Sequence, residues 1–365
     1  MSIARERPSP GQNRSLSAIQ VASVAGIPIR VHFTLILFLL WIARDVGSFA
    51  LVATIFACVV LHEIGHALVG LHYKVHTRDI TIYPIGGIAT LQNRPKPREE
   101  LWIALAGPAV NFTIFGLLYL GLALSGHPGV AWRVDLLQRS YIESVMVGNL
   151  VLGLFNLIPA FPMDGGRVLR ALLALHISET RATQIASAVG QVLAMAFLVA
   201  GFLSANVIWM LVALFVFLGA EQEARASLTR SFLAGHVARD VMQTDFRTLS
   251  HGETLEGASK LLLSGSQHDF PVDTGEQVPG ILTRSDLVNG LAVIGPSGYV
   301  AEVMQRAPRT VEPNLPLEDA VDLFSENDTS PILVMDHGQM VGLLTSENLS
   351  EFVMLETARS RTHRS

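Results

Sequence analysis

The stretch Leu61-His62-Glu63-Ile64-Gly65-His66-Ala67 decides how the chain folds and what it can bind. His62 and His66 are four residues apart, so on a helix both imidazole rings project from one face, one turn apart. Two imidazole nitrogens in this arrangement can take two corners of a tetrahedral zinc site. Glu63 follows His62, close enough to hold a water molecule beside the metal and take its proton. The alternative is two histidines packed on a buried helix without a metal.

The residues before this stretch, Phe49–Leu61, are almost wholly apolar. Soluble zinc proteases carry the same motif on amphipathic helices, whereas here it lies in a predicted membrane span. Ionisable side chains are costly at that depth, so they indicate a functional site with facing partners. Cys58 lies four residues before His62 and could share its helix face. A small apolar packing residue is the alternative for this cysteine.

Composition predicts a membrane domain followed by a soluble domain. Of the 365 residues, 50% are hydrophobic and 16% are charged, and the mean hydropathy is +0.42. Soluble proteins carry about a quarter of charged residues. The apolar excess ends near residue 220, after which the composition is ordinary. The net charge of -5 argues against a nucleic-acid partner, and a single cysteine excludes an internal disulfide.

Six apolar stretches read as membrane spans within a domain over residues 31–220. Their expected bounds are 31–42, 47–73, 101–124, 140–157, 182–203 and 207–219. Residues 1–30 form an N-terminal segment whose polar start is not followed by a cleavable signal pattern. Within it, residues 18–30 alternate weakly and predict a short strand or an interfacial segment.

Basic residues predict the orientation of these spans. With the N-terminus inside, the outside loops contain only Arg44, Arg133 and Arg139, and all other basic residues of this part fall inside. The inside set is Arg5, Arg7, Arg14, Arg30, Lys74, Arg78, Arg94, Lys96, Arg98, Arg167, Arg170 and Arg181. We therefore expect a multi-pass protein of the cell membrane with its N-terminus and soluble domain in the cytoplasm.

A strand-like segment follows the second span. Asp79–Leu91 alternates and is rich in β-branched residues, and it is interrupted by Pro84 and by Gly86 and Gly87. An exposed strand edge beside a protease site could hold an extended peptide by backbone pairing. A membrane-associated hairpin without a role in substrate binding is the alternative. Residues 93–100 are expected to be a polar linker.

The third span contains Gly107-Pro108-Ala109-Val110-Asn111. Small residues permit close approach of helices. Asn111 is a polar group in lipid and needs a partner. It either forms a structural hydrogen bond to another helix or polarises a substrate carbonyl.

After the fourth span the sequence runs from Asn156 to Arg167 through two prolines, Pro159 and Pro162, which break the helix. Gly165-Gly166 permits a turn that other residues could not make. Irregular backbone at membrane depth is tolerated only where protein or water covers it. Asp164 is therefore the best candidate for a third zinc ligand, which leaves one position for water. The alternative is that Asp164 caps the helix expected over 165–175.

The soluble part is an internal repeat, with a linker over 221–235, copies over 236–292 and 297–355, and a polar tail over 356–365. The matching pairs share one offset: Val237–Met242 with Tyr299–Met304, Arg247-Thr248 with Arg309-Thr310, and Gly280–Thr283 with Gly342–Thr345. The sequence of each copy predicts the same order of elements: a turn ending in Met, a short strand, an acidic helix, a strand with Pro, a Gly turn, a strand and a helix that begins at Thr. The two acidic helices are expected over 255–263 and 317–325.

These copies resemble a pair of cystathionine-β-synthase-type (CBS) modules. The resemblance implies a cleft for an adenine nucleotide, with the Asp of the final motif on the ribose. The first copy has Thr283 and Asp286 in that motif, whereas the second has Thr345 and Asn348, which departs from Asp. Dimerisation of two chains through the CBS modules, without a ligand, is the alternative.

The whole chain resembles the site-2 protease family of intramembrane zinc metalloproteases. The resemblance rests on the histidine motif in a membrane helix and on Asn156-x-x-Pro159-x-x-Pro162-x-Asp164-Gly165. It implies that His62, His66 and Asp164 bind one zinc ion per chain and that Glu63 is the catalytic base. Asn111, Asn156, Gly86 and Gly87 are expected to support the active site. The implied substrates are single-span membrane regulators such as anti-sigma factors.

The expected fold is a polytopic α-helical membrane protein of about six transmembrane helices with a small membrane-associated β element, followed by a soluble α/β CBS pair. Two other functions stay open at this stage. A CBS-regulated transporter or channel is disfavoured because the spans show no inverted repeat. A catalytically silent zinc-binding scaffold is disfavoured because Glu63 is intact.

Overall fold

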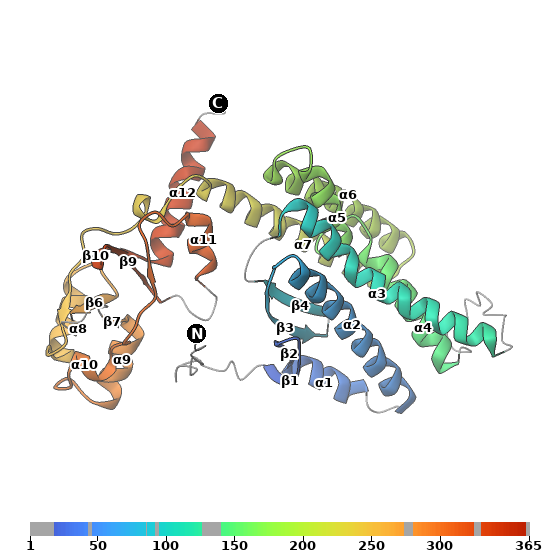
Figure 1. Ribbon diagram of the computed structural model, residues 1–365, viewed down its shortest axis with the longest axis horizontal. Coiled ribbons are helices and arrows are strands. Elements are labelled where there is room, and N and C mark those ends of the chain that lie inside the picture. The colour runs from blue at the N-terminus through green and yellow to red at the C-terminus, as the bar shows by residue number, and fades with distance from the viewer. Residues whose placement is uncertain are drawn as a thin grey trace, which may run out of the picture. The chain divides into compact units, whose positions relative to one another are not determined.

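The computed structural model describes residues 18–42, 46–84, 86–91, 95–125, 140–273, 280–324 and 330–362. They belong to two compact units, Met1–Ser227 and Leu228–Ser365 (Figure 1). Several expected features lie outside the described residues: the polar start over 1–17, Arg44, the loop with Arg133 and Arg139, Arg94 and the last residues of the tail.

The first unit contains a four-stranded sheet in the order β1-β2-β3-β4, and α1 and α2 separate its first two strands from its last two in sequence. Its strands are β1 (Ala18–Val24), β2 (Ile27–His32), β3 (Thr77–Tyr83) and β4 (Gly86–Leu91). The strands expected around residues 18–30 and 79–91 are therefore present, and the break falls at Pro84 as predicted. The buried face of the sheet packs on Leu35 and on Ala67, directly after the histidine motif. The sheet therefore lies against the part of the membrane domain that carries that motif.

Within the described residues, seven helices accompany this sheet: α1 (Phe33–Ile42), α2 (Val46–His72), α3 (Pro97–Leu124), α4 (Tyr141–Asn156), α5 (Asp164–Ala174), α6 (Glu179–Leu203) and α7 (Val207–Leu233), which continues past the unit boundary at Ser227. By length and composition, α2, α3, α6 and α7 can cross a membrane. The other two expected spans coincide with shorter helices, α1 with 10 residues and α4 with 16. The structure thus confirms a helical membrane domain with four full-length candidate spans. In Figure 1, α3 runs alongside α2 and α4, and it also contacts α5.

Two helices extend beyond their expected bounds. α3 begins at Pro97, although residues 93–100 were expected to be a linker. Proline suits the first turn of a helix, and the Lys96 N–H donates to Glu99 Oε2 at 2.9 Å, which caps this end. α7 continues through most of the expected linker to Leu233. Both extensions are rich in polar residues, so a search for apolar spans begins α3 too late and ends α7 too early.

The second unit contains two three-stranded sheets, β5-β6-β7 and β10-β9-β8. The first copy contains β5 (Leu249–Ser250), α8 (Leu255–Ser264), β6 (Phe270–Asp273), β7 (Gly280–Leu282) and α9 (Arg284–Val293). The second copy contains β8 (Thr310–Val311), α11 (Leu317–Asp322), β9 (Ile332–Asp336), β10 (Gln339–Leu344) and α12 (Ser346–Thr362). The short helices η2 (Ala238–Asp240) and α10 (Val300–Val303) precede them. The order of helices and strands expected for each copy is confirmed, whereas the turn over 274–279 lies outside the described residues. In the second copy, α11 ends at Asp322 and Pro331 precedes β9.

Each of the two turns ending in Met packs on the other copy. Gln243 pairs with Leu343 of β10, and Gln305 pairs with Ile281 of β7. A Cβ atom on Gly342 would lie 2.5 Å from Met242 Sδ, so this glycine makes room for the crossing segment. The turn that opens each copy therefore completes the fold of the other copy.

Candidate active site

Three side chains from α2 and α5 meet at one point. His62 Nε2 lies 3.1 Å from Asp164 Oδ2, and His66 Nε2 lies 3.2 Å from the same oxygen. The two Nε2 atoms are 3.0 Å apart. Among the described residues, these three form the one group of His, Cys, Asp or Glu whose ligand atoms gather as a metal ion requires. The structure thus brings together the three residues that were predicted to bind zinc.

Asp164 reaches this point from the first position of α5. The N-cap of α5 is Met163, so the alternative that Asp164 caps this helix is wrong. Gly165 and Gly166 seat the helix start on the preceding loop. A Cβ atom on Gly165 would collide with the carbonyl oxygen of Ile158, and one on Gly166 would lie 2.6 Å from Phe161 N. The two glycines therefore set the position from which the Asp164 carboxylate faces α2.

The ring nitrogens that face away from this point are held by α3. His66 Nδ1 donates to the carbonyl oxygen of Ile103 at 2.6 Å, and His62 Nδ1 donates to Asn111 Oδ1 at 2.5 Å. These bonds leave each Nε2 atom with its lone pair toward Asp164. Such outer partners are typical of metal-binding histidines. Two imidazoles and one carboxylate, each oriented in this way, fit a zinc ion with an open fourth position.

Gly107 makes the close approach of α3 to the two histidines possible. A Cβ atom there would lie 2.5 Å from His62 Nε2 and closer still to His66 Nε2. Any larger residue would therefore occupy the place where the ligand atoms meet. The sequence indicated close helix packing at this glycine but not its position against the two ligands.

The Glu63 side chain packs directly against the first residues of β4. A Cβ atom on Gly87 would lie 2.5 Å from Glu63 Cγ and 2.8 Å from Oε1. Gly86 pairs with Tyr83 where β4 begins, at φ +137°. β4 is an edge strand of the sheet, so backbone groups beside Glu63 have no partner strand on that side within the described residues.

The two predicted asparagines differ in their surroundings. Asn111 is fully buried and bonds His62, which is the interhelical hydrogen bond that was weighed as its structural role. Asn156 is the last residue of α4 and half-buried. Within the described part of the chain, its amide makes no side-chain hydrogen bond to the three predicted ligands.

Asn149 is a further buried polar residue, which sequence reasoning missed. It lies on α4, is 0% exposed, and accepts a hydrogen bond from Asn111 Nδ2 at 3.0 Å. Its own amide donates to the Val145 carbonyl and to Cys58 Sγ. Cys58 is thus buried beside this amide, away from the ligand atoms. A polar residue in an apolar span was the available signal, as it was for Asn111.

Arg170, past the middle of α5, joins three helices. Its guanidinium pairs with Glu100 on α3, with Nε to Oε1 at 3.0 Å, and with Glu223 on α7. It also lies over the ring of Phe161, 5.3 Å from the centroid. This group fixes α5, which carries Asp164, to two neighbouring helices.

The four residues expected to bind a nucleotide sit at helix starts. Thr283 Oγ1 accepts from the Asp286 N–H and donates to Asp286 Oδ2 at 2.6 Å. Thr345 and Asn348 make the equivalent pair of bonds at the start of α12. Gln305 Nε2 also donates to Asp286 Oδ2, at 2.9 Å. Both motifs therefore stabilise the helix that follows them.

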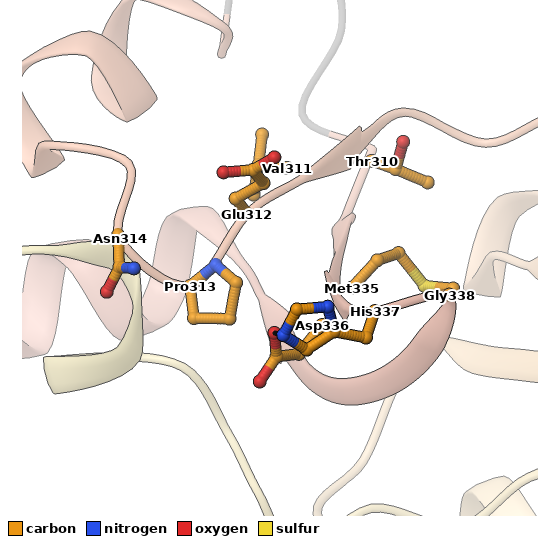
Figure 2. A pocket seen from close by; sticks show the side chains of 9 residues that line it. All are labelled: Thr310, Val311, Glu312, Pro313, Asn314, Met335, Asp336, His337 and Gly338. Atoms are coloured by element: carbon orange, nitrogen blue, oxygen red, sulfur yellow. Dashed lines mark ion pairs between the residues drawn. The ribbon is translucent and has the colours of Figure 1, made fainter.

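A polar cavity of about 620 Å³ lies at the other end of the second copy. It is lined by the segments 310–314 and 335–338. Figure 2 shows the side chains of Asp336, at the end of β9, and His337, in the turn before β10, beside Pro313. None of the four motif residues lines this cavity. It is therefore distinct from the place where the resemblance expects a nucleotide.

Comparison with known proteins matches the two units to two families. Peptidase family M50 matches residues 50–146 and 129–197, and the CBS domain matches residues 238–293 and 300–355. The zinc metalloprotease MJ0392 of Methanocaldococcus jannaschii is 31% identical, over 91% of this chain and 95% of that protein. The Synechocystis protein sll0528 is 27% identical, over 93% of this chain and 96% of that protein.

Solved structures give further likenesses. The site-2 protease from Methanocaldococcus jannaschii is 41% identical, covers 57% of this chain and 95% of that chain, and has a TM-score of 0.45. A structure of CBSX2 in complex with AMP is 24% identical, covers 33% of this chain and 98% of that chain, and has a TM-score of 0.29.

Proposed function

Because the chain belongs to peptidase family M50, the site-2 protease family of zinc metalloproteases, we propose that it hydrolyses peptide bonds within or near the transmembrane segments of membrane-bound regulators. The observation that carries this proposal is the meeting of His62, His66 and Asp164 beside a helix that can span a membrane. A hydrolytic group in this position acts on bonds at membrane depth. Single-span regulators such as anti-sigma factors are the substrates we propose.

Each polar residue of the site has a separate task in this proposal. His62, His66 and Asp164 hold zinc, which when bound supplies a Lewis acid that makes water nucleophilic near neutral pH and polarises a carbonyl oxygen. Glu63 takes the proton from the attacking water and delivers it to the leaving amine. The backbone at Gly87 limits the space in which the Glu63 carboxylate moves.

The edge of β4 is the proposed binding place for the cleaved segment. It lies beside Glu63 and offers backbone groups to an extended chain. A substrate helix must first unwind, because its carbonyl groups are hydrogen-bonded within the helix. We expect small and helix-breaking residues near the cleaved bond, since they lower the cost of unwinding.

Glu63→Gln tests the function directly. Purified protein in lipid vesicles should keep its zinc and lose cleavage of a single-span substrate, because the amide cannot accept the proton. Glu179→Gln, an exposed glutamate at the start of α6, should cleave at the normal rate. Full cleavage by Glu63→Gln would contradict the proposed base.

The other two functions weighed from the sequence lose their support. Transport would not require His62, His66 and Asp164 to meet at one point. Membership of a peptidase family explains why they do. A silent scaffold does not need Glu63 beside the edge strand. Cleavage that disappears with zinc removal would separate a protease from both.

The chain is a membrane protein by its apolar helices and its family. We place its N-terminus and its CBS unit in the cytoplasm of a cell, because basic residues gather in the segments on that side. A protease added outside intact spheroplasts should leave the CBS unit whole. Digestion of residues 236–355 under these conditions would reverse the orientation.

The CBS pair is the proposed regulatory part, with an adenine nucleotide as ligand and a second copy of the chain as partner. Asp286 uses Oδ2 within the protein, which leaves Oδ1 for a ribose hydroxyl. Calorimetric titration of the full chain with AMP and ATP should show binding that Asp286→Ala weakens. Equal binding by both proteins would remove Asp286 from the site, and light scattering of the same samples reports the dimer.

A further inference from the structure

We propose that Asn149 is a positioning residue for the zinc site, which fixes the tautomer of His62 through a directed chain of hydrogen bonds. The chain runs from α4 through α3 to α2. Asn149 Oδ1 accepts from Asn111 Nδ2 at 3.0 Å, and Asn111 Oδ1 accepts from His62 Nδ1 at 2.5 Å. This inference rests on the proposed role of His62 as a ligand.

The direction of the chain follows from its fixed end. The Val145 carbonyl can only accept, so the Asn149 atom 2.9 Å away must be the amide nitrogen Nδ2. The second hydrogen of that nitrogen points to Cys58 Sγ at 3.3 Å. Both donors of Asn149 are thus used on one side, and its oxygen faces Asn111.

Each following group has only one remaining orientation. Asn111 must offer its nitrogen to the Asn149 oxygen, so its own oxygen faces His62. His62 must then carry its proton on Nδ1, because an oxygen can only accept there. Nε2 is left as the lone-pair nitrogen, which is the form that binds a metal. The Val145 carbonyl on α4 therefore determines that Nδ1 of the His62 ring on α2 carries a proton.

Burial makes this orientation hold. Asn111 and Asn149 are 0% exposed and His62 is 5% exposed. If either amide turned over, two oxygens or two N–H groups would face each other without water to satisfy them. His66 has a simpler arrangement, because the Ile103 carbonyl accepts from its Nδ1 directly. The two ligands thus reach the same tautomer by different routes.

The test compares Asn149→Leu with Asn149→Asp. Leucine removes the chain's fixed end, whereas a buried, protonated carboxyl group can still donate to Val145 and accept from Asn111. In a chelator competition, Asn149→Leu should bind zinc roughly 10–100-fold more weakly. Asn149→Asp should stay close to the wild-type affinity. With zinc bound, NMR of the histidines should show the His62 Nδ1–H proton protected from exchange with water, and faster exchange of that proton in Asn149→Leu.

The control is Thr183→Val on α6, which removes a buried hydroxyl bonded to the Glu179 carbonyl. It should leave the zinc affinity and the exchange of the His62 Nδ1–H proton unchanged. Wild-type affinity in Asn149→Leu would overturn the proposal, as would a weaker affinity with the exchange of the His62 proton unaltered. If Asn149→Leu does not fold, Asn149→Ser replaces it, because a serine hydroxyl bonds the Val145 carbonyl and is too short for Asn111.

Zinc affinity and the exchange of the His62 Nδ1–H proton are measured without a substrate. They therefore separate this inference from the proposed protease activity. An inactive enzyme with normal zinc affinity and a protected His62 proton would contradict the activity alone.

Discussion

Gly107 on α3 faces His66 on α2 so closely that a Cβ atom at position 107 would overlap the Nε2 atom of the ring. The same atom would lie 2.5 Å from His62 Nε2. Gly107→Ala should therefore displace both rings and release zinc. We expect zinc content, measured by atomic absorption after dialysis, to fall by more than about tenfold, since ligand geometry must hold closely for binding.

Gly116→Ala on the same helix is the matched control for this change. A Cβ atom at Gly116 meets nothing within 4 Å, so its zinc content should equal that of the wild type. Equal zinc contents in Gly107→Ala and Gly116→Ala would show that α3 does not lie against the ligands as described.

Gly87→Ala should separate zinc binding from hydrolysis. The new methyl group would meet Glu63 Cγ at 2.5 Å and push the carboxylate aside, whereas the three ligands keep their places. We expect normal zinc content and a fall in kcat of roughly 100-fold, which is the usual effect of a misplaced general base. A variant that loses zinc in proportion to activity would place β4 against the metal ligands instead.

Arg170→Met should destabilise the membrane domain by about 2–3 kcal/mol, because it leaves two carboxylates without their partner. The side chains of Arg170 and Glu100 are 22% and 12% exposed, so water compensates little. Thermal unfolding in detergent measures the loss. Adding Glu100→Gln to this variant should recover part of it.

Arg225→Met provides the comparison for Arg170. Arg225 also pairs with a glutamate, Glu221, but its side chain is 77% exposed. We expect a change of at most about 0.5 kcal/mol for this pair. A loss as large as that of Arg170→Met would show that burial does not distinguish the two ion pairs.

Asp269→Asn should stabilise the first CBS copy at neutral pH. Burial raises the pKa of the Asp269 carboxyl group, and the nearby charges of Glu347 and Asp286 raise it further. The hydrogen bond from the Arg284 N–H lowers this pKa but does not cancel the effect of burial. The folded state thus favours the protonated acid, so this contribution to stability is present at low pH and is lost as the pH rises through the raised value. Asparagine keeps the acceptor for the Arg284 N–H, 3.0 Å away, without the charge.

Amide hydrogen exchange of β6 and β7 in the full chain checks this prediction. Slower exchange in Asp269→Asn at about pH 7, and no difference from wild type at about pH 3, is the expected result. Faster exchange at neutral pH would mean that the ionised carboxylate is the stabilising form.

The three residues that meet at the candidate site could be predicted because their signals are local. His62 and His66 are four residues apart on one helix, and Asp164 follows two prolines and precedes two glycines. Local chemistry of this kind is visible in a single sequence. The repeat of the CBS unit is visible for the same reason, since its two copies can be aligned with each other.

The supporting residues could not be predicted, because their contacts depend on how neighbouring helices are rotated. Gly107 faces the histidines and Asn149 faces Asn111 only once α2, α3 and α4 have packed. The ends of two helices were predicted wrongly for a different reason. Pro97 and the charged end of α7 begin or extend helices in polar sequence, where hydropathy gives no signal.

The separation of the ligands along the chain has a consequence for biosynthesis. Asp164 follows His62 by 102 residues. A ribosome that adds about 5–20 residues per second needs on the order of 5–20 s to cross that interval. During that time both histidines are already made, and the carboxylate that completes their group is not. The hydrolytic centre is therefore a late product of membrane insertion, and the nascent chain and its insertion machinery are not exposed to it while the earlier helices are being placed.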